Sequence, residues 1–470
     1  MIGDPIVREL PSSPAEQYFA RLAGQPYAFF LDSGMGGERL GRFSFLGAEP
    51  FLVMRSRGST VELASKDGTR QFRADALDVL QDLLCRYRVP RGAAPVPFCG
   101  GAVGYLSYDL GRSLEPAMRR SRPPPGDGGV PETLLGFYDT AIAIDHLQGK
   151  TYLVSTGLPE PPGPGRAARA EARLDDLERL IESSPCRVQA QSRPGPGRLP
   201  VSNVTREAYV RSVLRAKAYI EAGDIYQVNL SQRFSTPWSG DAWSLYQRLR
   251  CVNPAPFAAF LSFGPLAVLS ASPERFLRRD GDLIETRPIK GTRPRGLNDD
   301  QDRRLAAALR ASPKDQAEHI MIVDLERNDL GRVAVTGTVT VDELMALESY
   351  ATVHHLTSTV RARLRPDRTL TDLLRATFPG GSITGAPKIR AMEIIDELEP
   401  VRRGVYTGAI GYFSATGDLD LNVAIRTMVL QNGVAQFHVG GGIVYDSDPE
   451  AEYQETLDKG AAFFQALAGG

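Results

Sequence analysis

The alternation of apolar and polar residues predicts several strands in this chain. Short apolar runs at 140–144 and 152–155 are typical of strands in the amino-terminal part. From 227 to 234 apolar and polar residues alternate, so we expect a strand with its apolar side chains on one face. The opposite face of this strand carries Gln227, Asn229 and Ser231.

Two helices are predicted in the second half from apolar spacing and from their capping residues. Thr205 can accept a backbone hydrogen bond at the start of the first helix, and Gly223 is placed to end it. Ser312, with a proline after it, begins the second helix. Glu318 and Ile322 share a face of this helix, so we expect a carboxylate among apolar neighbours.

A third helix is predicted near the end of the chain, beginning at Asp448 and the proline that follows it. Helical spacing places three charged residues on one face: Glu452, Glu455 and Lys459. Apolar residues follow the same spacing on the opposite face: Tyr453, Leu457, Ala461 and Phe464. We expect the apolar face to pack on the core and the charged face to meet solvent or a ligand.

Proline and glycine are concentrated between 159 and 201. This segment separates an amino-terminal region, 1–158, from a carboxy-terminal region, 202–470. Inside it Leu174, Leu177 and Ile181 recur at helical spacing, which predicts a short charged helix between two flexible joints.

The net charge gives the chain no general attraction for nucleic acid or anionic lipid, because 55 basic residues are balanced by 56 acidic ones. The amino terminus lacks a signal-peptide pattern, and no apolar run approaches the roughly 20 residues that cross a bilayer. The four cysteines form no CxxC pair, which is typical of reduced thiols. We therefore expect a soluble cytoplasmic protein that does not bind membranes.

Lys290 is the first candidate for chemistry, since it lies between a proline two residues before it and a glycine directly after it. A lysine is nucleophilic only as the neutral amine, and burial or nearby arginines such as Arg287 and Arg293 can lower its pKa. A lysine in an arginine-rich stretch is more often a surface residue. The pattern alone leaves both interpretations open.

Scattered carboxylates are the second candidate. Mg²⁺ usually takes one or two carboxylates and completes its shell with water and substrate oxygens. Two acidic helices that face a common cleft would suit it, through residues such as Glu318, Glu452 and Glu455, with Glu274 elsewhere. The alternative is ordinary surface pairing, because Glu455 and Lys459 are four residues apart on a helix.

Three consecutive glycines, Gly440, Gly441 and Gly442, interrupt a strand-like run. Glycine in a strand marks either a bulge or a ligand that approaches the backbone closely, and exposed amides there can bind a carboxylate. The run is no GxGxxG fingerprint and does not indicate a nucleotide. His355 follows a β-prone stretch, but a lone histidine is more often structural than catalytic.

Taken together, these motifs resemble the chorismate-binding family, which includes anthranilate, aminodeoxychorismate, isochorismate and salicylate synthases. The matching stretches occur in the family's order between 202 and 459: 223–234, 253–257, 270–276, 318–332, 385–388 and 446–459. The resemblance implies an α+β fold in which two packed antiparallel β-sheets are flanked by helices. It also implies an enzyme that acts on chorismate with Mg²⁺ as its cofactor.

Two positions distinguish the branches of this family. Isochorismate and salicylate synthases carry a lysine base where this chain has Gln227, and anthranilate synthases typically carry alanine where it has Lys290. The Pro-Ile-Lys-Gly-Thr form at 288–292 is similar to the aminodeoxychorismate synthases. That similarity implies attack by Lys290 on carbon 2 of chorismate, loss of the carbon 4 hydroxyl, and then attack by ammonia at carbon 4.

The resemblance assigns further roles by position. Glu274 is implied as the general acid and base, and His355 as a proton-transfer group beside carbon 4. Glu318 and Glu455 are implied as Mg²⁺ ligands, with Glu452 acting through water. The substrate-binding residues implied are Tyr406, Arg426, Gly440, Gly441 and Gly442 around the enolpyruvyl carboxylate, with Thr292, Ser382 and Lys459 nearby.

The reaction implied needs ammonia, and the chain has no Gly-x-Cys-x-Gly elbow of the kind found in the glutaminases of this pathway. We therefore expect a separate glutamine amidotransferase subunit as partner. The family's amino-terminal half can also hold tryptophan, and Leu31, Asp32 and Ser33 lie in the corresponding region. Two alternatives remain: an anthranilate synthase-type enzyme, and a non-catalytic subunit that binds chorismate or tryptophan. The presence of all the implied catalytic residues argues against the non-catalytic subunit.

Overall fold

Two large antiparallel sheets form the fold of the computed structural model, which describes residues 4–33, 40–115, 117–118, 129–183, 199–350 and 353–468. In spatial order the first sheet contains β1 (Ile6–Leu10), β10 (Lys150–Ser155), β9 (Thr140–Asp145), β3 (Phe43–Gly47), β2 (Ala28–Asp32), β13 (Phe257–Phe263), β14 (Leu266–Ser272), β23 (Thr427–Gln431), β24 (Val434–Ile443), β12 (Gln227–Pro237) and β11 (Val201–Ser202). The short β20 (Gly385–Ala386) also pairs with β12.

The second sheet follows the order β17 (Ile289–Pro294), β19 (Val353–Arg363), β16 (Leu283–Arg287), β15 (Arg275–Asp280), β22 (Leu419–Val423), β21 (Ala409–Ser414), β7 (Gly101–Leu106), β8 (Thr133–Tyr138), β4 (Leu52–Arg57), β5 (Thr60–Ser65) and β6 (Gly68–Arg73), with β18 (Thr340–Ser349) on β19. Each sheet therefore joins strands from before 159 to strands from 201 onward. The pairs that join them are β2 with β13 in the first sheet and β7 with β21 in the second.

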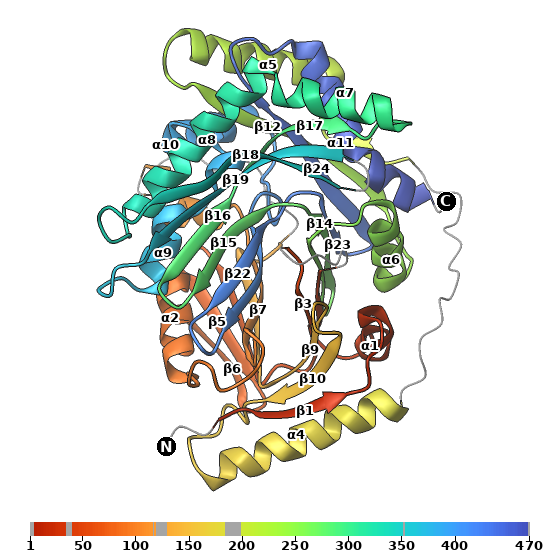
Figure 1. The fold of residues 1–470 in the computed structure, drawn as a ribbon, viewed down its shortest axis with the longest axis vertical. Helices are drawn as coiled ribbons and strands as arrows, with labels where there is room; N and C mark the ends of the chain where they lie inside the picture. Colours follow the sequence, from red (N-terminus) through yellow and green to blue (C-terminus); the bar gives the residue numbers. More distant parts are fainter. Residues whose placement is uncertain are drawn as a thin grey trace.

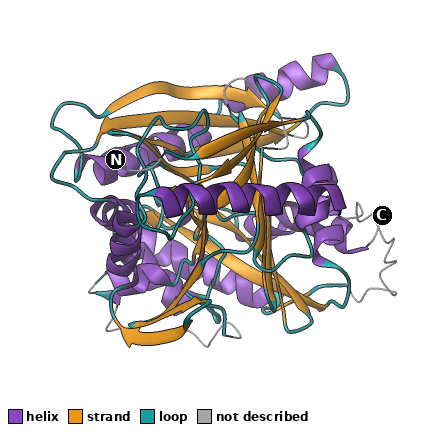
Figure 2. Ribbon diagram, turned by 90° about the horizontal axis from the view of Figure 1, so that it is seen from below, coloured by secondary structure: helices purple, strands orange, loops and turns teal. Residues whose placement is uncertain are grey.

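Helices cover the outer faces of both sheets (Figures 1 and 2). They are α1 (Ala15–Leu22), α2 (Ala76–Arg86), α3 (Leu110–Leu114), α4 (Pro164–Ser183), α5 (Arg206–Glu221), α6 (Ala242–Val252), α7 (Asp299–Arg310), α8 (Pro313–Gly331), α9 (Leu370–Thr377), α10 (Lys388–Leu398) and α11 (Pro449–Ala468), with a 3₁₀ turn at Gly381–Ile383. The fold is thus α+β, with two packed antiparallel sheets flanked by helices, as the resemblance implied. Among the described residues, no helix combines the length and apolarity needed to cross a bilayer.

Strand β2 shows why the layers pack in this way. Its consecutive residues Phe29 and Phe30 point to opposite faces and are both fully buried. Phe29 packs between the two sheets against Tyr138, whereas Phe30 packs outward against Phe19 of α1 and Trp243 of α6. A central strand with two buried faces reads as a continuous apolar run, which matches Ala-Phe-Phe-Leu here.

The capping residues begin the helices where the sequence predicts. Thr205 accepts from the backbone N–H of Ala208 at the start of α5, and Ser312 accepts from Asp315 at the start of α8. Helix α4 spans Pro164–Ser183, inside the segment 159–201, whose part 184–198 lies outside the described residues.

The packing of α11 corrects one prediction. Ala461 was expected on the buried apolar face but is exposed, while Glu452 is only 5% exposed. The carboxylate can be buried because the hydroxyl of Ser447 donates to its Oε1 at 2.6 Å. The charged face of this helix therefore lies partly inside the protein.

Candidate active site

Lys290 and Gly442 meet where an edge of the second sheet approaches β24 of the first. A Cβ atom on Gly442 would lie 3.2 Å from Nζ of Lys290 and 2.6 Å from Nε2 of Gln227. The strands that carry these residues, β17, β24 and β12, lie close together in the upper part of the molecule (Figure 1). Glycine at 442 leaves space beside the lysine that any larger residue would fill.

The other two glycines have different roles. A Cβ on Gly440 would lie 2.4 Å from the carbonyl oxygen of Leu230 in the neighbouring strand, so this glycine allows the strands to pair. A Cβ on Gly441 would lie 3.1 Å from Oε2 of Glu452 and 3.5 Å from Oε1 of Glu455. The acidic face of α11 therefore covers the glycine backbone.

Lys459 links α11 to β24, the strand that carries the three glycines. Its Nζ donates to the carbonyl oxygen of Gly440 at 2.9 Å and forms an ion pair with Glu455 at 2.7 Å. The pair of Glu455 and Lys459 that helical spacing suggested is therefore present, and it lies on the face of α11 that borders the site. It is only half-buried, so we assign it little stabilising energy.

The environment of Lys290 favours the neutral amine. Burial lowers its pKa, and the positive charge of Lys459 lowers it further, whereas the carboxylates of Glu318, Glu274 and Glu455 oppose the shift. The net direction is downward from 10.5. This lysine is therefore closer to a nucleophile at neutral pH than a solvated one would be.

Glu274 lies directly before β15 and is 4% exposed. Burial raises its pKa to about 7, while the nearby hydroxyl of Ser382, the charge of Lys290 and the backbone N–H of Ile289 act in the opposite direction. Its Oε1 has no hydrogen-bond partner in the described part of the chain. A carboxyl group that titrates near neutrality can give and take a proton in one catalytic cycle.

His355 on β19 faces the same region. Its Nδ1 is 2.9 Å from Oγ1 of Thr292 and 3.4 Å from the carbonyl oxygen of Gly291. Burial, and secondarily the charge of Arg426, lowers its pKa to about 4, so the ring is neutral at pH 7. Its buried Nε2 has no partner among the residues described, and a proton on Nδ1 would leave Nε2 as an acceptor.

Tyr406 is buried and Arg426 is partly buried, and the charge of Arg426 acts on the His355 ring. The Tyr406 ring stacks on His438 with centroids 5.1 Å apart, and burial raises its pKa to about 12. Nη1 of Arg426 donates to Oδ1 of Asn253 at 3.1 Å, and burial lowers the pKa of this arginine. We did not predict Asn253 from the sequence, although it begins the matching stretch 253–257 and so carried a usable signal.

Several polar atoms at this site are buried without protein partners. Within the described ranges these include both side-chain amide atoms of Gln227, Oε1 of Glu274, Nε2 of His355 and Oγ of Ser382. Buried polar groups are nearly always hydrogen-bonded in folded proteins, to protein or to ordered water. Their concentration around Lys290 is the pattern expected of a site that binds a polar ligand.

The three carboxylates expected to bind Mg²⁺ line the same site. Burial raises the pKa values of Glu318 and Glu452, and the negative charge of Glu455 adds to both shifts. Burial also opposes ionisation of Glu455, but Lys459 brings its pKa below the ordinary value. In the part of the chain that the structure describes, no three His, Cys, Asp or Glu side chains converge closely enough to ligate an ion alone. These three carboxylates fit Mg²⁺ if water and substrate oxygens complete the coordination shell of the ion.

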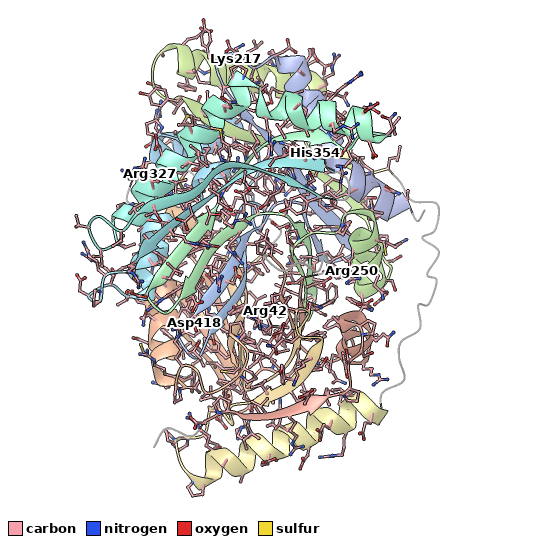
Figure 3. The ribbon with its side chains drawn as sticks, viewed as in Figure 1. Arg42, Lys217, Arg250, Arg327, His354 and Asp418 are labelled. Carbon is pink, nitrogen blue, oxygen red and sulfur yellow. The ribbon has the colours of Figure 1, made fainter. Side chains whose placement is uncertain are left out.

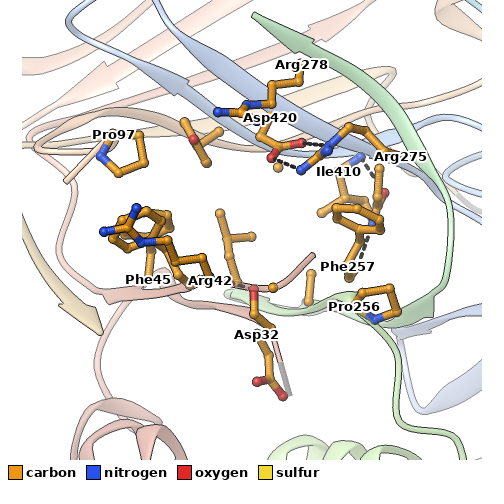
Figure 4. Close-up of a pocket in the computed structure, with 18 of the residues that line it drawn as sticks. Asp32, Arg42, Phe45, Pro97, Pro256, Phe257, Arg275, Arg278, Ile410 and Asp420 are labelled. Carbon is orange, nitrogen blue, oxygen red and sulfur yellow. Dashed lines mark hydrogen bonds and ion pairs between the residues drawn. The ribbon is translucent and has the colours of Figure 1, made fainter. Parts of the chain in front are cut away.

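A separate cavity of about 330 Å³ lies between the two sheets (Figure 4). Leu31, Asp32 and Ser33, the segment expected at a tryptophan site, line it. Asp32 turns its carboxylate away from the cavity toward α6, where Tyr246 and Arg250 donate to it. Figure 3 shows His354, the neighbour of His355, well above Arg42, which lines this cavity.

The comparison with protein families agrees with the motifs. The model described as "chorismate binding enzyme" matches residues 27–465. The chain belongs to this family. The aminodeoxychorismate synthase component 1 of Salmonella typhimurium is 44% identical over 97% of this chain and 96% of its own length. The anthranilate synthase component 1 of Pseudomonas aeruginosa is 42% identical over 96% of this chain and 92% of its own.

Solved structures of the family have the same fold. Anthranilate synthase component I of Streptococcus pneumoniae aligns with a TM-score of 0.79 at 35% identity, over 90% of this chain and 92% of that one. A menaquinone-specific isochorismate synthase of Escherichia coli aligns with a TM-score of 0.74 at 20% identity, over 99% and 94% of the two chains. At such identity the second likeness concerns the fold alone.

Proposed function

We propose that this chain aminates chorismate at carbon 4 to give 4-amino-4-deoxychorismate, as the names of its aminodeoxychorismate synthase relatives suggest. The relatives alone leave an anthranilate synthase open, since one of those is 42% identical. The observation that carries the proposal is Lys290, which lies beside Gly442 with a lowered pKa and among unpartnered polar groups. Anthranilate synthases typically have alanine at this position.

In the first step, the neutral amine of Lys290 forms a bond to carbon 2 of chorismate. The ring double bonds shift, the bond between carbon 4 and its oxygen breaks, and Glu274 gives its proton to the departing hydroxyl, which leaves as water. The pKa of about 7 allows Glu274 to be protonated before this step and ionised after it.

In the second step, ammonia forms a bond to carbon 4, the double bonds shift back, and the bond between carbon 2 and Lys290 breaks. The new ammonium group returns one proton to Glu274, which restores both residues. Nε2 of neutral His355 accepts a hydrogen bond from the incoming nitrogen, and Nδ1 on Thr292 fixes the orientation of the ring.

Two carboxylates of the substrate need separate partners. We assign the enolpyruvyl carboxylate to Tyr406, Arg426 and the backbone amides of Gly440, Gly441 and Gly442, with Thr292, Ser382 and Lys459 nearby. A bidentate arginine is suited to a carboxylate. Glu318 and Glu455, with Glu452 through water, would hold Mg²⁺, which supplies positive charge for the ring carboxylate when bound.

Ammonia is proposed to come from a separate glutamine amidotransferase subunit. The relatives are named "component 1", which implies that a second component exists for them. The cavity between the sheets is proposed to hold tryptophan. At a tryptophan concentration of 100 times Kd, bound ligand would stabilise the fold by about 2.7 kcal/mol, which a thermal melt detects.

The direct test is to mix the purified chain with chorismate, Mg²⁺ and ammonium at mildly alkaline pH and to identify the product by chromatography and mass. A non-aromatic aminodeoxychorismate, converted to 4-aminobenzoate by an added lyase, is the expected result. Anthranilate would contradict the assignment to carbon 4. Absence of any product, with the amidotransferase subunit present, would favour the non-catalytic alternative.

A further inference from the structure

A buried arginine outside the site connects the elements that form it. Arg403, between α10 and β21, has a side chain only 1% exposed. Its Nε and Nη2 donate to the two oxygens of Glu399 at 2.9 and 2.7 Å. Nη2 also donates to the carbonyl oxygen of Asn229 at 2.6 Å, and Nη1 to that of Ile383 at 3.0 Å and to Oγ1 of Thr407 at 3.3 Å.

Three of these acceptors, on Asn229, Ile383 and Thr407, lie next to residues that we assign to substrate binding. Ile383 follows Ser382, and Thr407 follows Tyr406. Asn229 lies on β12, directly opposite Gly442 in the antiparallel register. One guanidinium group therefore fixes the backbone beside Ser382, the residue beside Tyr406 and the strand that supports the glycines.

Glu399 extends the same connection along β12. Its Oε1 accepts from the backbone N–H of Ser231 at 2.8 Å and from the Ser231 hydroxyl at 2.9 Å. Ser231 is paired with Gly440 in the sheet. The carboxylate thus holds the strand at a second point opposite the glycine run.

The backbone at Thr407 is held in an unfavourable conformation. Its φ is +59°, a left-handed value that a β-branched residue rarely adopts. Its hydroxyl donates to the carbonyl oxygen of Tyr406 at 2.6 Å while accepting from Arg403. The Tyr406 ring lies against His438, and the Arg403 guanidinium is 5.8 Å from the ring centroid. Such strain persists only where the surroundings determine the backbone fully.

We propose that Arg403, held by Glu399, is a positioning residue that sets the relative placement of Ser382, Tyr406 and the glycine amides for the substrate carboxylate. A buried ion pair gives little net stability compared with apolar packing, so stability alone is a weak reason for its presence. This inference rests on the proposed function in taking chorismate as the ligand. It adds a residue that contacts no substrate and acts through three elements.

The test compares variants by the KM for chorismate, by kcat and by melting temperature. Arg403→Lys keeps the charge but loses the fork that reaches the acceptors together, and we expect KM to rise about ten-fold with a smaller change in kcat. Thr407→Gly removes the hydroxyl that Arg403 holds and relieves the strained φ, so it should fold even if the first variant does not. We expect its KM to rise about three-fold.

The matched control is Asp139→Asn in the amino-terminal region. Asp139 is 1% exposed and paired with Arg169 and Arg173, so its loss also breaks a buried ion pair, but far from the site. It should lower the melting temperature and leave KM unchanged. If the wild type turns over chorismate and Arg403→Lys keeps the wild-type KM, the positioning role is wrong. If only Thr407→Gly folds, a wild-type KM in that variant overturns the role in the same way. No binding or turnover of chorismate by the wild type would overturn both the proposed function and this inference.

Discussion

The cavity between the sheets and the region around Lys290 differ in how their polar and charged side chains are paired. Around the cavity between the sheets, several charged side chains form ion pairs: Arg275 pairs with Glu285 and Asp420, and Arg42 pairs with Asp145. Around Lys290, polar atoms of Gln227, Glu274 and His355 lack partners among the described residues.

We call these the paired region, around the cavity, and the unpaired region, around Lys290, where several buried polar atoms need a ligand or water as a partner. Leaving a buried donor or acceptor unpaired costs about 1–3 kcal/mol, so a protein rarely does so several times in one place without a function. In the paired region, burial opposes ionisation of Asp145. Its pKa is nevertheless lowered, because Arg42 and the backbone N–H groups of Gln148 and Leu147 together outweigh burial. In the unpaired region burial dominates, and the pKa of Glu274 rises to about 7. Reactivity at neutral pH follows from leaving the groups unpaired.

Removal of Lys290 should have the largest effect on the unpaired region. Lys290→Ala removes the nucleophile, and we expect the rate of aminodeoxychorismate formation to fall by about 10³-fold. Intact-mass measurement with chorismate and Mg²⁺, without ammonia, should show an adduct on the wild type and none on the variant. Lys150→Ala is the control, because Lys150 is half-exposed and pairs with Glu9, on strands β10 and β1 that carry none of the candidate site residues. Full activity of Lys290→Ala would rule out the covalent route.

Glu274→Gln should lower kcat by about 10²-fold, because glutamine cannot give a proton to the leaving hydroxyl. The pH dependence provides a second readout. The rate should rise with pH as Lys290 loses its proton and fall above about 7 as Glu274 loses its own. The glutamine variant should lose the falling limb. A falling limb that persists in Glu274→Gln would assign it to another group.

The same substitution should stabilise the folded protein at alkaline pH. The pKa of Glu274 is raised from 4.5 to about 7 on folding, so the folded state holds the proton more tightly. Stability from this group is therefore full at low pH, falls as pH rises from about 4.5 to about 7, and is then constant. We expect Glu274→Gln to gain up to about 3 kcal/mol over the wild type at pH 8 and little at pH 5, measured by denaturant unfolding at both pH values. An equal gain at both would contradict the raised pKa.

Gly442→Ala should reduce kcat/KM by about ten-fold with little loss of stability. The atoms nearest to the added Cβ belong to the ends of the Gln227 and Lys290 side chains, which can move away but then occupy the substrate space. Gly440→Ala is the contrasting variant, since its Cβ would meet the carbonyl oxygen of Leu230 and should lower the melting temperature. Steady-state kinetics and thermal melts of both variants separate the two roles. Equal melting temperatures would show that the strands tolerate both.

Asp420→Asn should change catalysis least. It breaks the pair with Arg275, which is 8% exposed, and should cost about 1–3 kcal/mol of unfolding free energy while kcat/KM stays within about two-fold. Urea unfolding and steady-state kinetics measure the two effects. Because Arg275 follows Glu274 in the chain, a large fall in kcat/KM would show that the paired region and the active site are coupled.

Local signals predicted the starts of α5 and α8 correctly, because a cap involves residues within one turn of each other. The exposed side of α11 was predicted partly wrongly, since burial of Glu452 depends on a hydroxyl in the loop before the helix. The pairing of β2 with β13 was out of reach of the pattern, because both are apolar strands that could pair with many others.

The composition of the candidate site came from resemblance, and its arrangement came only from the structure. The motifs indicated Lys290, Glu274 and the glycines, but single residues such as Lys290 also fitted a surface interpretation. What makes Lys290 unusual is its contact with Gly442 from the other sheet, about 150 residues away in sequence. Arg403 and Glu399 lie after the end of α10, and their burial depends on contacts with β12, about 170 residues earlier in the chain, which the local sequence does not show.

The shared sheets also have a consequence during protein synthesis. Strand β2 ends at Asp32, but its neighbour β13 begins only at Phe257. The stretch of chain between β7 and its partner β21 is longer still. At about 5–20 residues per second, the ribosome needs roughly 10–45 s to make the roughly 225 residues between β2 and β13. During that interval the edge of β2, with its phenylalanines, has no partner, and an open apolar edge is a template for aggregation. Nascent chains of this protein should therefore depend on chaperones until the second half has left the ribosome.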